Sequence, residues 1–234
     1  MGCQTSMLIS KEYGVIFIHI PKTGGTTLHR AFREVLKDDT NILSTGSQAM
    51  RRITINQPSK FLDFYNKVHL KYKYLEDRQN SPMETGVWLK YFDSYRIFTA
   101  MRNPWSWYVS NYLFDQKLHA ADPTYITRPS TVLPFDEWLK TRDTNQFDWV
   151  IDSYGKNCAT MIGQTETLQD SFNQMCDEIG VPSIQLENVN VSEESLQEDG
   201  TIDHSYYRDF YTDETKAIVA EKSKRVIEQF NYEF

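Results

Sequence analysis

The sequence predicts an α/β fold of three layers, an αβα arrangement in which helices cover both faces of a central parallel sheet. Two apolar runs, residues 14–20 (GVIFIHI) and residues 95–101 (YRIFTAM), are typical of buried strands and too short for buried helices. Each run is followed by a segment with the features of a helix, and a third strand is expected at residues 158–162. Parallel strands need long crossover connections, so strands that alternate with helices favour a parallel sheet covered on both faces.

The first strand and the first helix have clear sequence limits. Pro21 stops the run at residues 14–20. A helix is then expected from about residue 26 to residue 37, and two threonines of the type that caps helices stand at its start. The apolar residues that recur at helical spacing in it are Leu28, Ala31, Phe32, Val35 and Leu36.

The second strand ends at Arg102-Asn103-Pro104, and Pro104 suits the first turn of a helix that runs to about residue 119. Residues 120–133, with two prolines and scattered Ser and Thr, are expected to form a surface loop. The remaining predicted helices cover residues 134–141, 166–179 and 212–230. No repeat or Pro/Gly/Ser-rich linker divides the chain, so we expect one domain over residues 14–234 after a tail of residues 1–13.

Composition excludes several classes of protein. The 234 residues (27.5 kDa) carry a net charge of −7, which argues against a protein that coats nucleic acid. Residues 1–75 nevertheless contain 11 Lys and Arg against 5 acidic residues, so an anionic ligand is expected in this first third. The 3 cysteines show neither a disulfide framework nor zinc spacing. No run is long enough to span a membrane and no signal peptide is recognisable, so we expect a soluble, cytoplasmic protein.

The most informative segment is residues 19–28 (HIPKTGGTTL), which joins the first strand to the start of the first helix. Gly24 and Gly25 permit the left-handed backbone in which several N–H groups converge on one anion, and the helix start adds partial positive charge. Lys22 adds a full charge, and Thr26 and Thr27 add hydroxyl donors. In the loop that binds triphosphates with magnesium, the lysine directly precedes the hydroxyl residue. Here the lysine precedes the glycines, so transfer without a metal is the simpler interpretation.

This segment resembles the phosphosulfate-binding loop of the sulfotransferases that use 3′-phosphoadenosine 5′-phosphosulfate (PAPS). The most similar branch is that of the carbohydrate O-sulfotransferases acting on heparan and related glycans, with their bacterial relatives. The resemblance implies a sulfotransferase fold similar to that of P-loop NTPases. It also implies that the 5′-phosphosulfate is bound by Lys22, Thr23, Gly24, Gly25, Thr26 and Thr27.

A second motif follows the strand at residues 95–101. Arg102 comes directly after its carboxyl end, where ligands of such sheets bind. Ser110 lies about two helical turns, roughly 12 Å, further on. R-N-P-x-x-x-x-V-S-x-Y is similar to the motif in which the family's Arg and Ser bind the 3′-phosphate of PAPS. Many members carry Arg where this chain has Trp107, and the aromatic residues of this helix are expected in the core.

Transfer to a hydroxyl also needs charge stabilisation on the leaving oxygen and a base for the acceptor proton. Lys22 is the candidate for the first task. Our hypothesis for the general base is His69, which lies between the two motifs, at about the point where the resemblance places a catalytic histidine. Asp63 and Glu34 are the fallback carboxylates.

The leading interpretation is thus a PAPS-dependent O-sulfotransferase whose partner is a carbohydrate or another small hydroxylated acceptor, without nucleic acid or a bound metal. Two other interpretations stay open. One is a small nucleotide kinase, and the other is a non-catalytic module that binds nucleotide or glycan. The order of residues in the glycine-rich loop and the lack of an obvious metal-binding carboxylate after a strand argue against the kinase.

Overall fold

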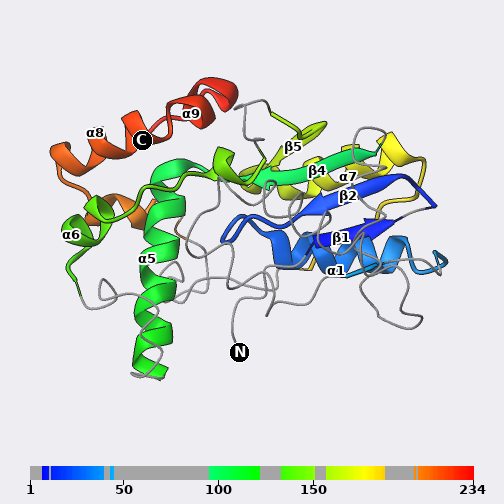
Figure 1. Cartoon of the computed structure of the whole chain (residues 1–234), viewed down its shortest axis with the longest axis horizontal. Helices are drawn as coiled ribbons and strands as arrows, with labels where there is room; N and C mark the ends of the chain where they lie inside the picture. The colour runs from blue at the N-terminus through cyan, green and yellow to red at the C-terminus, as the bar shows by residue number, and fades with distance from the viewer. Residues whose placement is uncertain are drawn as a thin grey trace, which may run out of the picture.

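In the described residues, one five-stranded sheet joins residues 7–10, 15–18 and 43–44 to residues 96–101 and 161–164, which are distant in sequence (Figure 1). The computed structural model describes residues 7–10, 12–39, 43–44, 95–121, 133–150, 157–187, 203 and 205–234. Within these residues the strand order is β3-β1-β2-β4-β5. The strands are β1 (Met7–Ser10), β2 (Val15–Ile18), β3 (Leu43–Ser44), β4 (Arg96–Met101) and β5 (Met161–Gln164).

The centre of the sheet is parallel, as expected, and its edge is antiparallel. Strands β2, β4 and β5 run parallel, whereas β1 pairs antiparallel with both β2 and β3. β1 falls in the segment 1–13, which the sequence suggested to be a tail. Residues 7–10 are a correction to that expectation, because Leu8 and Ile9 become buried once this strand pairs with β2.

Helices flank the sheet and extend beyond one end of it (Figure 1). They are α1 (Gly25–Val35), α5 (Pro104–Ala121), α6 (Phe135–Lys140), α7 (Leu168–Ile179), α8 (Asp213–Lys222) and α9 (Lys224–Phe230). Three short 3-10 helices accompany them within the described residues, namely η4 (Gln146–Trp149), η5 (Thr165–Thr167) and η7 (Tyr206–Phe210).

The strands alternate their side chains between two cores, because successive residues of a strand point to opposite faces. Phe17 and Phe98 pack with α1 and α7 on one face, where the Phe32 ring centroid lies 5.3 Å from that of Phe17 and 6.3 Å from that of Phe98. Ile16 and Ile97 pack with η4 and α9 on the other face. This is the predicted three-layer αβα arrangement.

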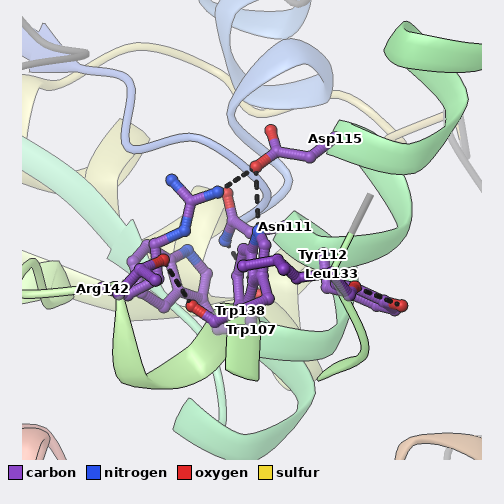
Figure 2. Close-up of polar contacts among 8 residues, drawn as sticks. Trp107, Asn111, Tyr112, Asp115, Leu133, Trp138 and Arg142 are labelled. Carbon is purple, nitrogen blue, oxygen red and sulfur yellow. Dashed lines mark hydrogen bonds and ion pairs between the residues drawn. The ribbon is translucent and has the colours of Figure 1, made fainter. Parts of the chain in front are cut away.

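A third core joins α5, α6, η7 and α8 at one end of the sheet (Figure 1). It is largely aromatic. At its border, the buried Arg142 guanidinium pairs with the Asp115 carboxylate of α5 and lies 4.2 Å from the ring centroid of Trp138 of α6 (Figure 2). The indole N–H of Trp138 donates to the same carboxylate at 3.2 Å. These contacts fix α5 against α6.

Most predicted elements are present, with shifted ends. The third strand was expected at residues 158–162 and is found at Met161–Gln164, where it pairs with the end of β4. The helix expected at residues 212–230 is broken into α8 and α9 at Ser223, whose backbone is not helical. Most of the loop expected at residues 120–133 lies outside the described residues. In the described part of the chain, no helix is long and apolar enough to cross a membrane.

Candidate functional site

The parallel pairing of β2 and β4 brings the two sequence motifs to one edge of the sheet. Val15 is in register with Arg96, and Phe17 with Phe98. Both strands therefore end side by side, and the loop after β2 faces the segment after β4. The Arg102 guanidinium donates to the backbone oxygen of Lys22 at 3.5 Å, which joins the motifs directly.

The loop between β2 and α1 has the backbone expected of an anion-binding turn. Lys22 and Gly24 both have left-handed conformations, with φ of 66° and 74°. Left-handed residues within a short turn are typical of loops whose N–H groups converge on an anion. The Thr23 hydroxyl is buried and donates to the Ile20 oxygen at 2.9 Å, so this hydroxyl closes the loop from inside.

Close packing excludes a side chain at Gly25, and the left-handed backbone disfavours one at Gly24. A Cβ atom on Gly25 would lie 1.9 Å from Cδ2 of His19, and one on Gly24 would lie 2.7 Å from Cδ2 of Leu168. The first turn of α1 is thus pressed against the buried His19 imidazole. Thr26 is partly exposed at this turn, and Thr27 is buried.

The first turns of α5 form the wall opposite this loop. The Asn103 side-chain oxygen caps the helix, accepting from the N–H groups of Trp105 at 3.1 Å and Ser106 at 3.3 Å. The indole N–H of Trp107 donates to the Pro21 oxygen at 2.7 Å. The Lys22 ammonium lies 4.8 Å from the ring centroid of Phe114, so its positive charge sits on this wall.

Two residues that the sequence analysis did not select hold the backbone after β4. Gln146 of η4 binds both the N–H and the oxygen of Arg102. Glu166 accepts from the Asn103 N–H and from the Tyr232 hydroxyl, each at 2.7 Å. Burial, with a further contribution from Glu166, raises the pKa of Tyr232, so this hydroxyl keeps its proton as donor. Gln146 and Glu166 lie far in sequence from Arg102 and Asn103, so no local sequence pattern indicates their roles.

Ser110 is buried inside α5, on the turns that follow Arg102. No hydrogen bond joins Ser110 to Arg102 among the described residues. Both nevertheless belong to one continuous stretch, the end of β4 and the start of α5. A shared anion would have to bridge the roughly 12 Å between them along the helix, together with the reach of the arginine side chain.

The candidate bases differ in what the structure says about them. His69 and Asp63 lie outside the described residues. Glu34 is exposed near the end of α1, where its carboxylate lies 3.4 Å from the Lys37 ammonium. It is nine residues, or about 14 Å along the helix, from Gly25. The position of Glu34 therefore does not support a role as base at the loop.

The site thus combines backbone N–H groups, an ammonium group and a guanidinium group at one edge of the sheet. This donor set matches a ligand with two separate anionic groups. The described residues hold no cluster of side chains suited to a metal ion.

Comparison with known proteins gives one finding. The model of the sulfotransferase family matches residues 5–233 of the chain, and the match includes both motifs. No curated protein and no solved structure matches the chain significantly.

Proposed function

The chain belongs to the sulfotransferase family, and we propose that it transfers a sulfuryl group from PAPS to a hydroxyl of a carbohydrate or a similarly polyhydroxylated acceptor. The observation that carries this proposal is the contact between the two motifs. The guanidinium of Arg102 reaches the backbone of Lys22, so a phosphosulfate bound at the loop has a cation available for a second phosphate nearby.

The donor fits the groups that are present. The backbone N–H groups of the loop and the start of α1 would hold the 5′-phosphosulfate, with the hydroxyls of Thr26 and Thr27 as further donors. Because the Thr23 hydroxyl already donates to Ile20, Thr23 would contribute its N–H group. Arg102 and Ser110 would hold the 3′-phosphate. The residues proposed to bind the donor are Lys22, Thr23, Gly24, Gly25, Thr26, Thr27, Arg102 and Ser110.

The reaction is an in-line displacement at sulfur. The acceptor oxygen forms a bond to sulfur while the bond from sulfur to the bridging oxygen breaks, and 3′,5′-adenosine bisphosphate leaves with the electron pair. The Lys22 ammonium would stabilise the charge that develops on the bridging oxygen. His69 would take the proton of the acceptor hydroxyl as general base. No step in this scheme needs a metal.

The decisive experiment measures donor binding and transfer separately. Calorimetry with 3′,5′-adenosine bisphosphate and with ATP plus magnesium is followed by transfer of radiolabelled sulfate from PAPS to a panel of carbohydrate acceptors. We expect binding of the bisphosphate and transfer to at least one carbohydrate. Selective binding of ATP with magnesium would instead indicate a kinase, and binding without transfer to any acceptor would indicate a non-catalytic module.

Two lysines allow a matched test of the charge-stabilising role. We expect Lys22→Ala to lower transfer by at least about 100-fold, which is typical of the loss of one donor that stabilises the transition state. Lys37→Ala is the control, because Lys37 is exposed two residues after α1 and pairs only with Glu34 in the described structure. Equal transfer by the two variants would refute the role of Lys22.

The role of His69 is tested in the same way. His69→Ala should abolish transfer and leave the affinity for 3′,5′-adenosine bisphosphate nearly unchanged, because a base acts on the acceptor and not on the donor. Retention of most of the transfer activity would exclude His69 as the base.

A further inference from the structure

We propose that Trp107 is a positioning residue for the anion-binding loop, through the hydrogen bond from its indole N–H to the Pro21 oxygen. This inference rests on the proposed function for its consequence in catalysis. Its physical basis is the 2.7 Å contact between α5 and the loop. Trp107 would hold the peptide between Pro21 and Lys22 in one orientation and thereby keep Lys22 in its left-handed conformation.

The indole is itself firmly held. Trp107 is 4 % exposed, and its ring packs edge-on against that of Tyr108, with centroids 4.9 Å apart. Its backbone N–H donates to the Asn103 oxygen at 2.8 Å, and its backbone oxygen accepts from the Asn111 side chain at 2.8 Å (Figure 2). A donor with so little freedom fixes the position of the oxygen that it binds.

The orientation of this peptide decides which groups face the ligand. In a trans peptide the oxygen of one residue and the N–H of the next point in opposite directions, and the described residues contain no cis peptide. Trp107 holds the Pro21 oxygen on the side of α5, and Arg102 attracts the Lys22 oxygen. The N–H groups of Lys22 and Thr23 therefore point away from these two donors. Carbonyl oxygens, which repel anions, are kept on the opposite side.

Lys22 needs such a contact more than its neighbours do. A left-handed conformation is unfavourable for any residue with a Cβ atom, and Lys22 adopts it with φ of 66°. Without the bond from Trp107, this peptide is free to rotate and Lys22 to relax towards a common conformation. The relaxation would displace both its N–H group and the ammonium that now lies 4.8 Å from the Phe114 ring centroid.

Trp105 provides a matched control on the same helix. It is 5 % exposed, and its indole N–H also donates to a backbone oxygen, that of Lys216 at 3.1 Å. That oxygen belongs to α8, not to the loop. Replacing either tryptophan removes one buried indole donor from α5, but only the replacement of Trp107 releases the loop.

The experiment replaces the indole N–H at residue 107 or 105 by sulfur, through incorporation of 3-benzothienylalanine, which keeps the size of the side chain. Trp107→Phe and Trp105→Phe serve as a second pair. For the residue 107 variants we expect about ten-fold weaker binding of 3′,5′-adenosine bisphosphate, about what one lost hydrogen bond produces. We also expect faster amide exchange in a peptide spanning residues 19–28 without ligand. The residue 105 variants should match the wild type within two-fold in both measurements.

Equal exchange in this peptide for the wild type and both residue 107 variants would overturn the inference. Equal changes in amide exchange and in bisphosphate affinity for the residue 107 and residue 105 variants would also overturn it. Because the exchange measurement needs no donor, it decides the role of Trp107 even if the wild type fails to bind the bisphosphate, a result that would refute only the proposed function.

Discussion

The side-chain amide of Gln146 makes two reciprocal hydrogen bonds with the backbone of Arg102. Its oxygen accepts from the Arg102 N–H at 2.7 Å, and its nitrogen donates to the Arg102 oxygen at 2.8 Å. Gln146 is 1 % exposed and belongs to η4, which packs on the sheet face opposite α1. A buried side-chain amide on the sheet face opposite α1 therefore fixes the backbone of the proposed phosphate-binding arginine.

Gln146→Leu should lower both stability and donor affinity. The substitution leaves the partly buried N–H and oxygen of Arg102 without their side-chain partner, which we expect to cost about 1–2 kcal/mol in the free energy of unfolding. It should also weaken binding of 3′,5′-adenosine bisphosphate, because the backbone from which the Arg102 side chain extends is no longer held in place. Urea unfolding and calorimetry measure the two effects.

Gln169→Leu is the control for this prediction. The Gln169 amide also binds backbone, accepting from Leu186 N–H at 2.7 Å and donating to the Ile184 oxygen at 3.0 Å, but it lies on α7. We expect its loss to reduce stability and to leave the affinity for the bisphosphate unchanged. A similar loss of affinity in both variants would show that Gln146 acts only through overall stability.

Gly25→Ala should disrupt the start of α1. The added methyl group would lie 1.9 Å from Cδ2 of His19, so the helix or the imidazole must move. We expect a loss of about 1–3 kcal/mol in the free energy of unfolding, typical of an overpacked core, with weaker bisphosphate binding. The double variant with His19→Ala should be less destabilised than the sum of the single variants, because removal of the ring makes room. Strict additivity in urea unfolding would contradict this collision.

Arg142 and Asp115 form an ion pair in which each side chain compensates the charge of the other (Figure 2). The Arg142 side chain is 9 % exposed, so Asp115→Ala leaves a nearly buried guanidinium without its carboxylate. We expect Asp115→Ala and Arg142→Met each to cost about 2–4 kcal/mol in the free energy of unfolding. The double variant should cost clearly less than the two together. A coupling energy near zero in this cycle would show that the pair does not stabilise the contact of α5 with α6.

High pH should destabilise the protein through its buried tyrosines. Burial raises the pKa of Tyr108, Tyr211 and Tyr232 above the usual value of 10.0. Above about pH 10 the unfolded state loses these protons while the folded state keeps them, so the free energy of unfolding falls as pH rises. Each tyrosine contributes up to about 1.4 kcal/mol per pH unit. Urea unfolding between pH 8 and pH 11 measures the slope.

Tyr211→Phe tests the origin of this slope. It removes one raised pKa, and with it a hydrogen bond to the Trp105 oxygen at 2.9 Å. We expect lower stability at pH 8 but a shallower decline above pH 10. Unchanged stability of the wild type between pH 9 and pH 11 would contradict the role of these tyrosines.

Local patterns predicted much of the fold. The apolar runs of β2 and β4 and the helical spacing in α1 place these elements within a few residues of where they are found, and the helix predicted at residues 166–179 is found as α7. Such patterns reflect which face of a single element is buried. β1 was not predicted, because its four residues are too few to show a periodic pattern. They become buried only by pairing with β2.

The site divides in the same way. The loop with Lys22 and the glycines was recognisable because its residue types and their short spacing form a pattern within ten consecutive residues. Gln146 and Glu166 were not recognisable, because they act on backbone groups 44 and 63 residues away. His69 stays a prediction, since it lies outside the described residues.

The sequence by itself determined the chemistry of the two motifs, a glycine-rich loop with Lys22 and an arginine after a strand, since these depend on residue type and short spacing. Only the tertiary structure decided that they meet. The parallel register of β2 and β4 brings Arg102 to the Lys22 oxygen and Trp107 to the Pro21 oxygen. Contacts between residues about 80 positions apart depend on which strands pair. Local sequence does not determine that pairing, because it is selected by the burial of both strands in the two cores.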